Sequence, residues 1–433
     1  MSKSLTLFEH EWQPFAWTDG DLALLERLRL STKTDVLKAT IRKGKGAIQA
    51  MQHVGVVRLG NRTIQVLPKI YQSRDAESEE LKTKEATANL LRMLAYAGEL
   101  PVREHELAPL IRQTDNWFEI LTRLFATHLR EEWQRGAYRN YQTIEEVSPV
   151  LKGKWDIDEY LKRPERRYVF SVSYDEFTAD NQLNRVFRFV VERLWKLTRD
   201  YDNRQMLGEL RQWLEEVTLV AQLTARDANP SQLTRLNDRY RPLLNLARVF
   251  LDGGALQMAA GDLSTFAFVF DMNQLFEKFI AGFVHRHAGE ILPDELRDCD
   301  FLPQSRGASR YLAERGQRKV FQTKPDIVFR DGLRFPLLVD TKYKSLDERD
   351  RKLGVSQADF YQMHAYAHRY RCKRVLLLYP QTVGASGSVR ACFKLEECEH
   401  TVEVSSINLF IDFSRKADRQ KFITELRTSF SQE

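Results

Sequence analysis

The segment KPDIVFRDGLRFPLLVDTKYK, residues 324–344, constrains the fold more than any other part of the chain. Two short apolar runs flank Asp331-Gly332, a residue pair typical of the turn between antiparallel strands. Asp326 begins the first run, and Asp340 ends the second. Side chains two residues apart in a strand point to the same face, so we expect Asp340 and Lys342 to lie together. The segment is therefore predicted to be a hairpin that carries acids and a lysine.

The register of this hairpin decides whether its two acids meet. A tight turn at Asp331-Gly332 alone would place Asp326 opposite Leu337, roughly 10 Å along the strand from Asp340. The connection must be wider or bulged if both carboxylates are to bind one ion. Pro336 permits a bulge because it cannot donate a hydrogen bond to the strand ladder.

Paired carboxylates and a lysine in this arrangement favour a metal site. Two neighbouring carboxylates repel each other and tend to take up a proton unless a cation lies between them. A hard ion, Mg²⁺ or Mn²⁺, accepts carboxylates, a carbonyl oxygen and waters while leaving room for a phosphate oxygen. It would polarise a scissile phosphate and acidify a bound water, which Lys342 could orient. The simpler alternative is that these charges are only the solvated end of a hairpin.

Two helices near the hairpin could supply further site residues. Glu277 in NQLFEKFI lies near the edge of an apolar helical face, where it is either a third acid or an exposed charge. Gln362 and Tyr366 are four residues apart, hence on one helical face, and could bind a backbone phosphate or hold Lys342 in place.

Neither zinc nor disulfides are indicated. His364 and His368 are also four residues apart, but there is no HExxH pattern and no evident third ligand. The four cysteines lack a paired CxxC spacing and are expected to be reduced thiols; they are Cys299, Cys372, Cys392 and Cys398.

The composition is that of a soluble protein with two or three domains. The chain has 433 residues, of which 43% are hydrophobic and 29% charged. A formal net charge of +6 is compatible with a polyanionic partner but does not require one. The first residues contain acids and a proline instead of a signal-peptide core, and no run is long and apolar enough for a membrane helix. We therefore expect a cytoplasmic protein.

Strand and helix signals alternate along the chain. VGVVRLGNRTIQVLPKIY, residues 54–71, predicts a hairpin that turns at Gly60-Asn61 and is ended by Pro68. Helical periodicity is found in 79–98 and 117–136, and again from about 182 to 252, where LDGG indicates a linker. Beyond it we expect a helix, the hairpin, a helix over 356–370, the strands RVLLLYP and INLFIDF, and a last helix. This order predicts an α+β or α/β multidomain protein, with a central mixed sheet covered by helices in its C-terminal part.

The combined motifs resemble those of the PD-(D/E)xK nuclease superfamily. Pro325-Asp326 and Asp340-Thr341-Lys342 are similar to its two strand motifs, Glu277 to its first-helix acid, and Gln362 with Tyr366 to the QxxxY element of its RecB-like branch. Five further segments resemble, in the same order, those of the McrC family, the nuclease subunit of McrBC modified-cytosine restriction systems. They are VLPKIY, LKGKWD, DNQLNRVFRF, NQLFEKFI and YQMHAYA.

The McrC resemblance implies a division of labour. Residues 255–433 would form a Mg²⁺-dependent DNA endonuclease with Asp326, Asp340, Lys342 and Glu277 as catalytic residues and the three acids as metal ligands. Residues 1–175, β-rich and helical, would dock into a hexameric McrB-like AAA+ GTPase and stimulate its hydrolysis of GTP, and residues 176–254 would be a helical connector. The chain itself has no GxxxxGK[ST] phosphate loop. Modified double-stranded DNA would be the substrate, in defence against phage.

The residues that would contact the ring do not follow from these motifs. The basic segment IRKGKG is either a solvated loop or an element that reaches phosphate or a partner. The candidates are Arg42, Lys43, Lys45 and Lys69.

Two other functions stay open at this stage. The chain could be a non-catalytic adaptor that binds DNA or regulates an AAA+ ring, although the intact set of Asp326, Asp340 and Lys342 disfavours this. It could also be a stand-alone RecB-like nuclease, although much of the chain lies outside the expected nuclease domain.

Overall fold

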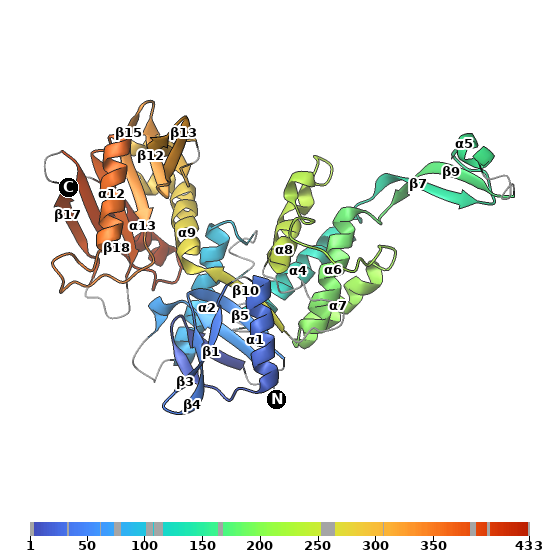
Figure 1. Ribbon diagram of the computed structural model, residues 1–433, viewed down its shortest axis with the longest axis horizontal. Coiled ribbons are helices and arrows are strands. Elements are labelled where there is room, and N and C mark those ends of the chain that lie inside the picture. Colours follow the sequence, from blue (N-terminus) through green and yellow to red (C-terminus); the bar gives the residue numbers. More distant parts are fainter. Residues whose placement is uncertain are drawn as a thin grey trace. The chain divides into compact units, whose positions relative to one another are not determined.

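The computed structural model of the protein describes residues 4–32, 34–60, 62–72, 79–100, 107, 116–162, 168–252, 265–305, 307–381, 387–395 and 399–431. The chain forms two compact units, the first made of Met1–Trp117 with Ala267–Glu433 and the second of Phe118–Phe266. These units do not coincide with the three segments expected from the sequence, because the N-terminal and C-terminal parts pack together. Figure 1 shows the elements of both units. Within the described residues, no helix is long and apolar enough to cross a membrane.

The N-terminal part of the first unit contains a four-stranded sheet with the order β1-β6-β5-β10. Its strands are β1 (Ser4–Phe8), β5 (His53–Leu59), β6 (Arg62–Leu67) and β10 (Thr265–Asp271). The predicted hairpin is confirmed by the antiparallel pairing of β5 with β6 around Gly60, whose φ is +56°. A Cβ atom at Gly55 would lie 2.0 Å from the Phe268 carbonyl oxygen, so only glycine lets β10 approach β5 this closely.

A smaller sheet with the order β2-β4-β3 packs nearby. It comprises β2 (Trp12–Pro14), β3 (Leu37–Arg42) and β4 (Lys45–Ala50), with α1 (Asp19–Thr32) between β2 and β3. The basic segment is therefore the turn of a hairpin, with Lys43 and Gly44 in the left-handed region. One hydrophobic core serves both sheets and contains Leu7, Leu37, Ile48 and Val57.

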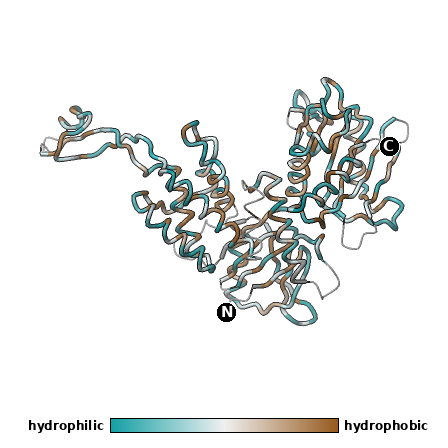
Figure 2. The backbone as a smooth tube through the Cα atoms, turned by 180° about the vertical axis from the view of Figure 1, so that it is seen from behind, coloured by the Kyte–Doolittle hydropathy of each residue, from teal (hydrophilic) through white to brown (hydrophobic). Residues whose placement is uncertain are grey.

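The C-terminal part of the first unit is a six-stranded sheet with the order β11-β14-β15-β16-β18-β17. Its strands are β11 (Asp300–Pro303), β14 (Ile327–Asp331), β15 (Arg334–Thr341), β16 (Arg374–Pro380), β17 (Arg390–Lys394) and β18 (Thr401–Ile407). The pairs β15/β16 and β16/β18 are parallel and the others antiparallel. The predicted mixed sheet is thus confirmed. Figure 2 shows largely hydrophobic strands in this part of the chain.

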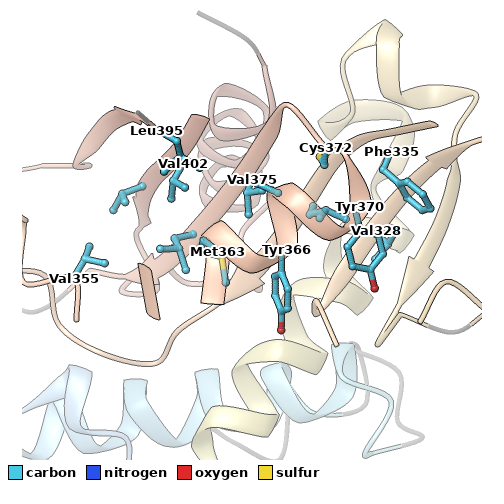
Figure 3. Close-up of a cluster of buried hydrophobic side chains, with 14 of the residues drawn as sticks. Val328, Phe335, Val355, Met363, Tyr366, Tyr370, Cys372, Val375, Leu395 and Val402 are labelled. Atoms are coloured by element: carbon cyan, nitrogen blue, oxygen red, sulfur yellow. The ribbon is translucent and has the colours of Figure 1, made fainter. Parts of the chain in front are cut away.

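Helices cover both faces of this sheet. Figure 3 shows Met363, Tyr366 and Tyr370 of α12 (Gln357–Tyr370) in one cluster with Val328 and Val375 from the strands. Phe329 points to the opposite face, where its ring lies 5.8 Å from that of Phe430 in α13 (Lys416–Phe430). A separate hairpin, β12 (Arg310–Arg315) with β13 (Arg318–Thr323), precedes β14.

The predicted strand INLFIDF is wrong, because β18 ends at Ile407 and residues 408–413 follow it in irregular conformation. Side chains of the N-terminal part satisfy the backbone of this segment. The Tyr71 hydroxyl donates to the Leu409 carbonyl at 2.7 Å, and Asn89 Nδ2 donates to the Ile411 carbonyl at 2.8 Å. The apolar residues here are buried by tertiary packing instead of by pairing in a sheet.

Two helices join the halves of the first unit. They are α2 (Glu79–Tyr96) and α9 (Met272–Arg286), and both were predicted. A Cβ atom at Gly282 of α9 would lie 1.9 Å from the Tyr96 carbonyl oxygen. Shorter helices complete this unit, namely η1 (Lys69–Tyr71), α10 (Ala288–Ile291) and α11 (Asp294–Arg297).

The second unit combines a helical body with a thin β arm. Its helices are α4 (Trp117–Gln134), α6 (Gln182–Leu197), α7 (Tyr201–Trp213), η4 (Pro230–Gln232), η5 (Asp238–Tyr240) and α8 (Arg241–Asp252). The arm consists of β7 (Asn140–Ser148), β8 (Lys154–Trp155), α5 (Ile157–Lys162) and β9 (Phe170–Thr178). Figure 1 shows β7 and β9 running away from α6 and α7, with α5 at the far end. The expected linker at LDGG lies mostly outside the described residues, since only Leu251 and Asp252 are described.

Candidate active site

The β14–β15 hairpin brings Asp326 and Asp340 together. Ile327 pairs with Val339, so the acids that flank this pair, one before β14 and one in β15, face each other at the same end of the sheet. The register shifts between Phe329 and Asp331. The predicted bulge is confirmed, and Pro336 lies in it.

Thr341, the residue after Asp340, holds the Asp326 carboxylate in place. The Thr341 backbone N–H and hydroxyl each donate to Asp326 Oδ2 at 2.7 Å. Burial raises the pKa of Asp326, although these two hydrogen bonds oppose the shift. Two donors on one oxygen leave the other carboxylate oxygen available to a ligand.

Asp340 and Lys342 form a buried ion pair. Lys342 Nζ lies 2.7 Å from Asp340 Oδ2, and the Asp340 side chain is 3% exposed. Burial first, and then the negative charge of Asp326, raise the pKa of Asp340 to about 7. Burial alone would lower the pKa of Lys342, but the nearby carboxylates, Asp340 foremost, raise it. The lysine is therefore a protonated, positively charged group.

Glu277 of α9 lies close enough to this site to interact electrostatically with Asp326 and Lys342. Burial and the charge of Asp326 raise its pKa to about 7, whereas a hydrogen bond from the Gln304 side chain opposes the shift. Gln304 also contacts the backbone of Asp326, because the Gln304 backbone N–H donates to the Asp326 carbonyl at 2.6 Å. Gln304 and Ser305 both have positive φ, 53° and 51°, a costly conformation for residues other than glycine.

Gln362 and Tyr366 hold the lysine, which is one of the two roles considered for them. Lys342 Nζ donates to Gln362 Oε1 at 2.9 Å, and Gln362 Nε2 donates to the Tyr366 hydroxyl oxygen at 2.7 Å. Figure 3 shows the Tyr366 hydroxyl at the margin of the hydrophobic cluster, directed away from it. A buried aromatic ring thus anchors a polar chain that ends at the lysine.

Asp359 is a neighbour of the lysine that sequence reasoning missed. It accepts a hydrogen bond from Lys344 Nζ at 2.7 Å and lies 3.8 Å from Lys342 Nζ. It also accepts from the Ser356 hydroxyl at 2.6 Å, while its own backbone N–H donates back to that hydroxyl. The sequence SQAD carries this capping pattern, so the signal was available.

The residues at this site fit a divalent cation. Apart from its contact with Lys342, Asp340 Oδ2 has no hydrogen-bond partner in the part of the chain that the structure describes. Two facing, buried carboxyl groups with raised pKa values form a site that a cation would stabilise. Across the described residues, no three His, Cys, Asp or Glu side chains form a complete metal-binding group, so waters or a substrate would complete the coordination.

The predicted partner-binding residues fall into two groups. Arg42, Lys43 and Lys45 are exposed at the β3–β4 turn. Lys69 is different, because its Nζ donates to the Tyr343 carbonyl at 3.3 Å inside the first unit.

The two histidines lie close together on α12. The rings of His364 and His368 are 4.5 Å apart, and His400 lies 5.3 Å from His368. No metal-binding group was found among the described residues. Neither Cys299 nor Cys372 is in a disulfide bond.

A family model described as McrBC 5-methylcytosine restriction system component matches residues 48–380. The chain belongs to this family and is a component of such a restriction system. No curated protein shows significant similarity to the sequence.

Solved structures support the fold assignment. One match is to a chain in a refined half-complex from the tetradecameric assembly of Thermococcus gammatolerans McrB AAA+ hexamers with bound McrC. Its TM-score is 0.70 at 24% identity, over 98% of this chain and 100% of that chain. A second match, to a cryo-EM structure of the Thermococcus gammatolerans McrBC complex, has a TM-score of 0.50 at 27% identity, over 66% of this chain and 88% of that chain.

Proposed function

We propose that the protein is the Mg²⁺-dependent DNA endonuclease subunit of a McrBC-type restriction complex and acts with an AAA+ GTPase ring. The observation that carries this proposal is the convergence of Asp326, Asp340 and Lys342 at one end of the β14–β15 hairpin, where Glu277 interacts electrostatically with Asp326 and Lys342. Membership of the McrBC family supports the restriction role.

The chain's own residues account for the positioning and the charge of such a site. Asp326 and Asp340 would hold the metal ion, with Glu277 near them as a candidate third ligand, and the bound ion would supply Lewis acidity toward a phosphate oxygen and a water. Thr341 orients Asp326 through two hydrogen bonds. Gln362 holds the Lys342 ammonium, whose positive charge stabilises the negative charge that develops on the phosphate during hydrolysis.

Cleavage of DNA by variants of Asp340 and Lys342 tests the proposal. The protein would be mixed with a McrB-type AAA+ ring, GTP, Mg²⁺ and methylated plasmid DNA. We expect Asp340→Ala and Lys342→Ala each to reduce the cleavage rate by about 100-fold or more, because each removes a charge used in the reaction. Stimulation of the partner's GTPase should stay unchanged, which would show that both variants still bind the ring.

Asp331→Ala is the matched control for Asp340→Ala, since Asp331 is an exposed acid at the opposite end of the same hairpin. It should cleave at the wild-type rate. Normal cleavage by Asp340→Ala would show that the assignment of the active site is wrong.

The main competitor is a non-catalytic adaptor of an AAA+ ring. The buried acids argue against it, because a cluster that repels phosphate and destabilises the charged state has no use in DNA binding alone. Metal binding distinguishes the two functions. An endonuclease should show a Mg²⁺- or Ca²⁺-dependent rise in melting temperature that Asp326→Asn with Asp340→Asn removes, whereas an adaptor should show none.

We also propose the β arm of the second unit as the segment that contacts the ring. Its cross-strand pair Tyr141 and Phe177 has ring centroids 5.1 Å apart, yet the two residues are 71% and 54% exposed. Tyr168 in the same arm is 75% exposed. Exposed aromatic residues of this kind are typical of protein interfaces. The basic turn at Arg42–Lys45 is the alternative contact.

A further inference from the structure

A buried polar cluster adjoins the candidate active site and comes from the opposite end of the chain. Glu9 follows β1 and is 1% exposed, and Tyr343 follows Lys342 and is 3% exposed. The Tyr343 hydroxyl donates to Glu9 Oε2 at 3.0 Å across 334 positions of sequence. Neither residue belongs to the motifs found in the sequence.

Lys69 completes this cluster from η1, the short helix that follows the N-terminal hairpin. Its backbone N–H donates to the same Glu9 oxygen at 3.0 Å. Its ammonium donates to the Tyr343 carbonyl at 3.3 Å and lies 4.9 Å from the centre of the tyrosine ring. Residues that follow β1 and β6 therefore hold Tyr343 by its hydroxyl, its ring and its backbone.

These contacts act at the residue next to the lysine of the site. The Lys342 backbone N–H donates to the Leu378 carbonyl of β16 at 2.9 Å, which is the last point at which the C-terminal sheet holds this strand. The next residue, Tyr343, is held by Glu9 and Lys69 of the N-terminal part. The backbone that carries the Lys342 side chain is thus fixed on one side by each half of the first unit.

Packing of the N-terminal part of the first unit against its C-terminal part does not by itself require a buried carboxylate such as that of Glu9. The same interface contains a neutral example, in which the buried Tyr71 hydroxyl donates to the Leu409 carbonyl at 2.7 Å. A buried acid costs free energy unless its hydrogen bonds are made, so its contact with Tyr343, the residue after Lys342, calls for a local purpose.

We infer that Glu9, acting through Tyr343, is a positioning residue for Lys342, so that the N-terminal part of the first unit completes the nuclease centre. This inference rests on the proposed endonuclease function. Residues of the C-terminal sheet alone would then hold the acids but leave the lysine poorly placed.

Two matched tyrosine variants test the inference in the full chain with its ring, GTP and Mg²⁺. Tyr343→Phe and Tyr71→Phe each delete one buried hydroxyl at the same interface. We expect Tyr343→Phe to lower the single-turnover cleavage rate at saturating DNA about tenfold, because a small displacement of a reacting group is costly. The Kd for DNA and the GTPase stimulation should not change. Tyr71→Phe should lose similar stability but cleave at the wild-type rate.

Equal rates for the two variants, whether normal or reduced, would overturn the inference, because the contact would then serve only cohesion. An inactive wild-type protein would instead refute the endonuclease function itself, and the inference with it. Normal wild-type activity together with normal Tyr343→Phe activity would refute only the inference.

A double-mutant cycle tests whether Glu9 acts through the tyrosine. Glu9→Gln keeps an acceptor of the same shape and should cleave faster than Glu9→Val, which has none. In the Tyr343→Phe background, Glu9→Val should cause no further loss of rate, because the hydrogen bond between the two residues is already absent. Fully additive losses would show that Glu9 does not act through Tyr343.

Discussion

At the scale of single residues, the candidate site separates what spacing can predict from what it cannot. The contacts of Asp340 with Lys342 and of Gln362 with Tyr366 were predictable because each pair is close in sequence, on one strand face or one helix face. The strained corner at Gln304 and Ser305 was not predictable, because glutamine and serine give no sequence signal for positive φ.

The Glu9 carboxyl provides a prediction for the pH dependence of stability. Burial raises its pKa from an ordinary value of 4.5 to about 7. The folded protein therefore binds this proton more tightly than the unfolded chain does. The contribution of Glu9 to the free energy of unfolding falls as the pH rises from about 4.5 to about 7. Glu9→Gln lacks this proton equilibrium.

Thermal denaturation from pH 5 to pH 8 measures the effect. The melting temperature of Glu9→Gln, minus that of the wild type, should increase with pH and level off above about 7. Any loss of hydrogen bonding in the variant adds only a constant offset. A difference that does not vary with pH would show that Glu9 is not buried as described.

At the scale of elements, strands and helices with a strong local pattern were predictable, whereas elements decided by distant partners were not. The β5–β6 and β14–β15 hairpins followed from their turn residues, and the bulge at Pro336 from the need to align two acids. The segment after Ile407 has a strand-like pattern, but Tyr71 and Asn89 satisfy its carbonyls from another part of the chain. Side chains more than 300 residues away cannot be read from a local pattern.

The contact between α2 and α9 gives a prediction at this scale. Gly282→Ala would place a Cβ atom 1.9 Å from the Tyr96 carbonyl oxygen, so the helices must move apart. We expect it to lower the free energy of unfolding by about 1–3 kcal/mol, as overpacking does. Denaturant unfolding measures this loss.

Gly289→Ala is the control, because nothing lies within 4 Å of a Cβ atom built at that position. It should be neutral or stabilising, since alanine favours a helix more than glycine does. Equal stability of both variants would show that α2 and α9 do not approach closely at Gly282.

At the scale of the whole molecule, the thin arm is the feature that composition and periodicity left undefined. Residues 138–176 gave short, mixed signals because a narrow sheet has little buried face and therefore no clear alternation. Its long β7–β9 pairing is antiparallel over nine residues of each strand.

Replacing the exposed aromatic pair tests whether this arm contacts the ring. Tyr141→Ser with Phe177→Ser should weaken binding to the AAA+ partner by about tenfold or more, as expected for interface aromatic residues. Binding can be followed by stimulation of the partner's GTPase, and Mg²⁺-induced stabilisation should stay normal. Arg42→Ala with Lys45→Ala should bind normally; the opposite pattern would assign docking to the basic turn.

The pairing of β10 with β5 has a consequence for synthesis of the protein on the ribosome. The N-terminal sheet takes its fourth strand from residues 265–271, after the whole second unit has been made. Until then, the edge of β5 and the glycine that receives β10 stay uncovered on the nascent chain. Such an edge readily pairs with other strands, so a pause or truncation before residue 265 should produce an aggregation-prone fragment. The N-terminal sheet therefore stays incomplete for as long as the ribosome is translating the second unit.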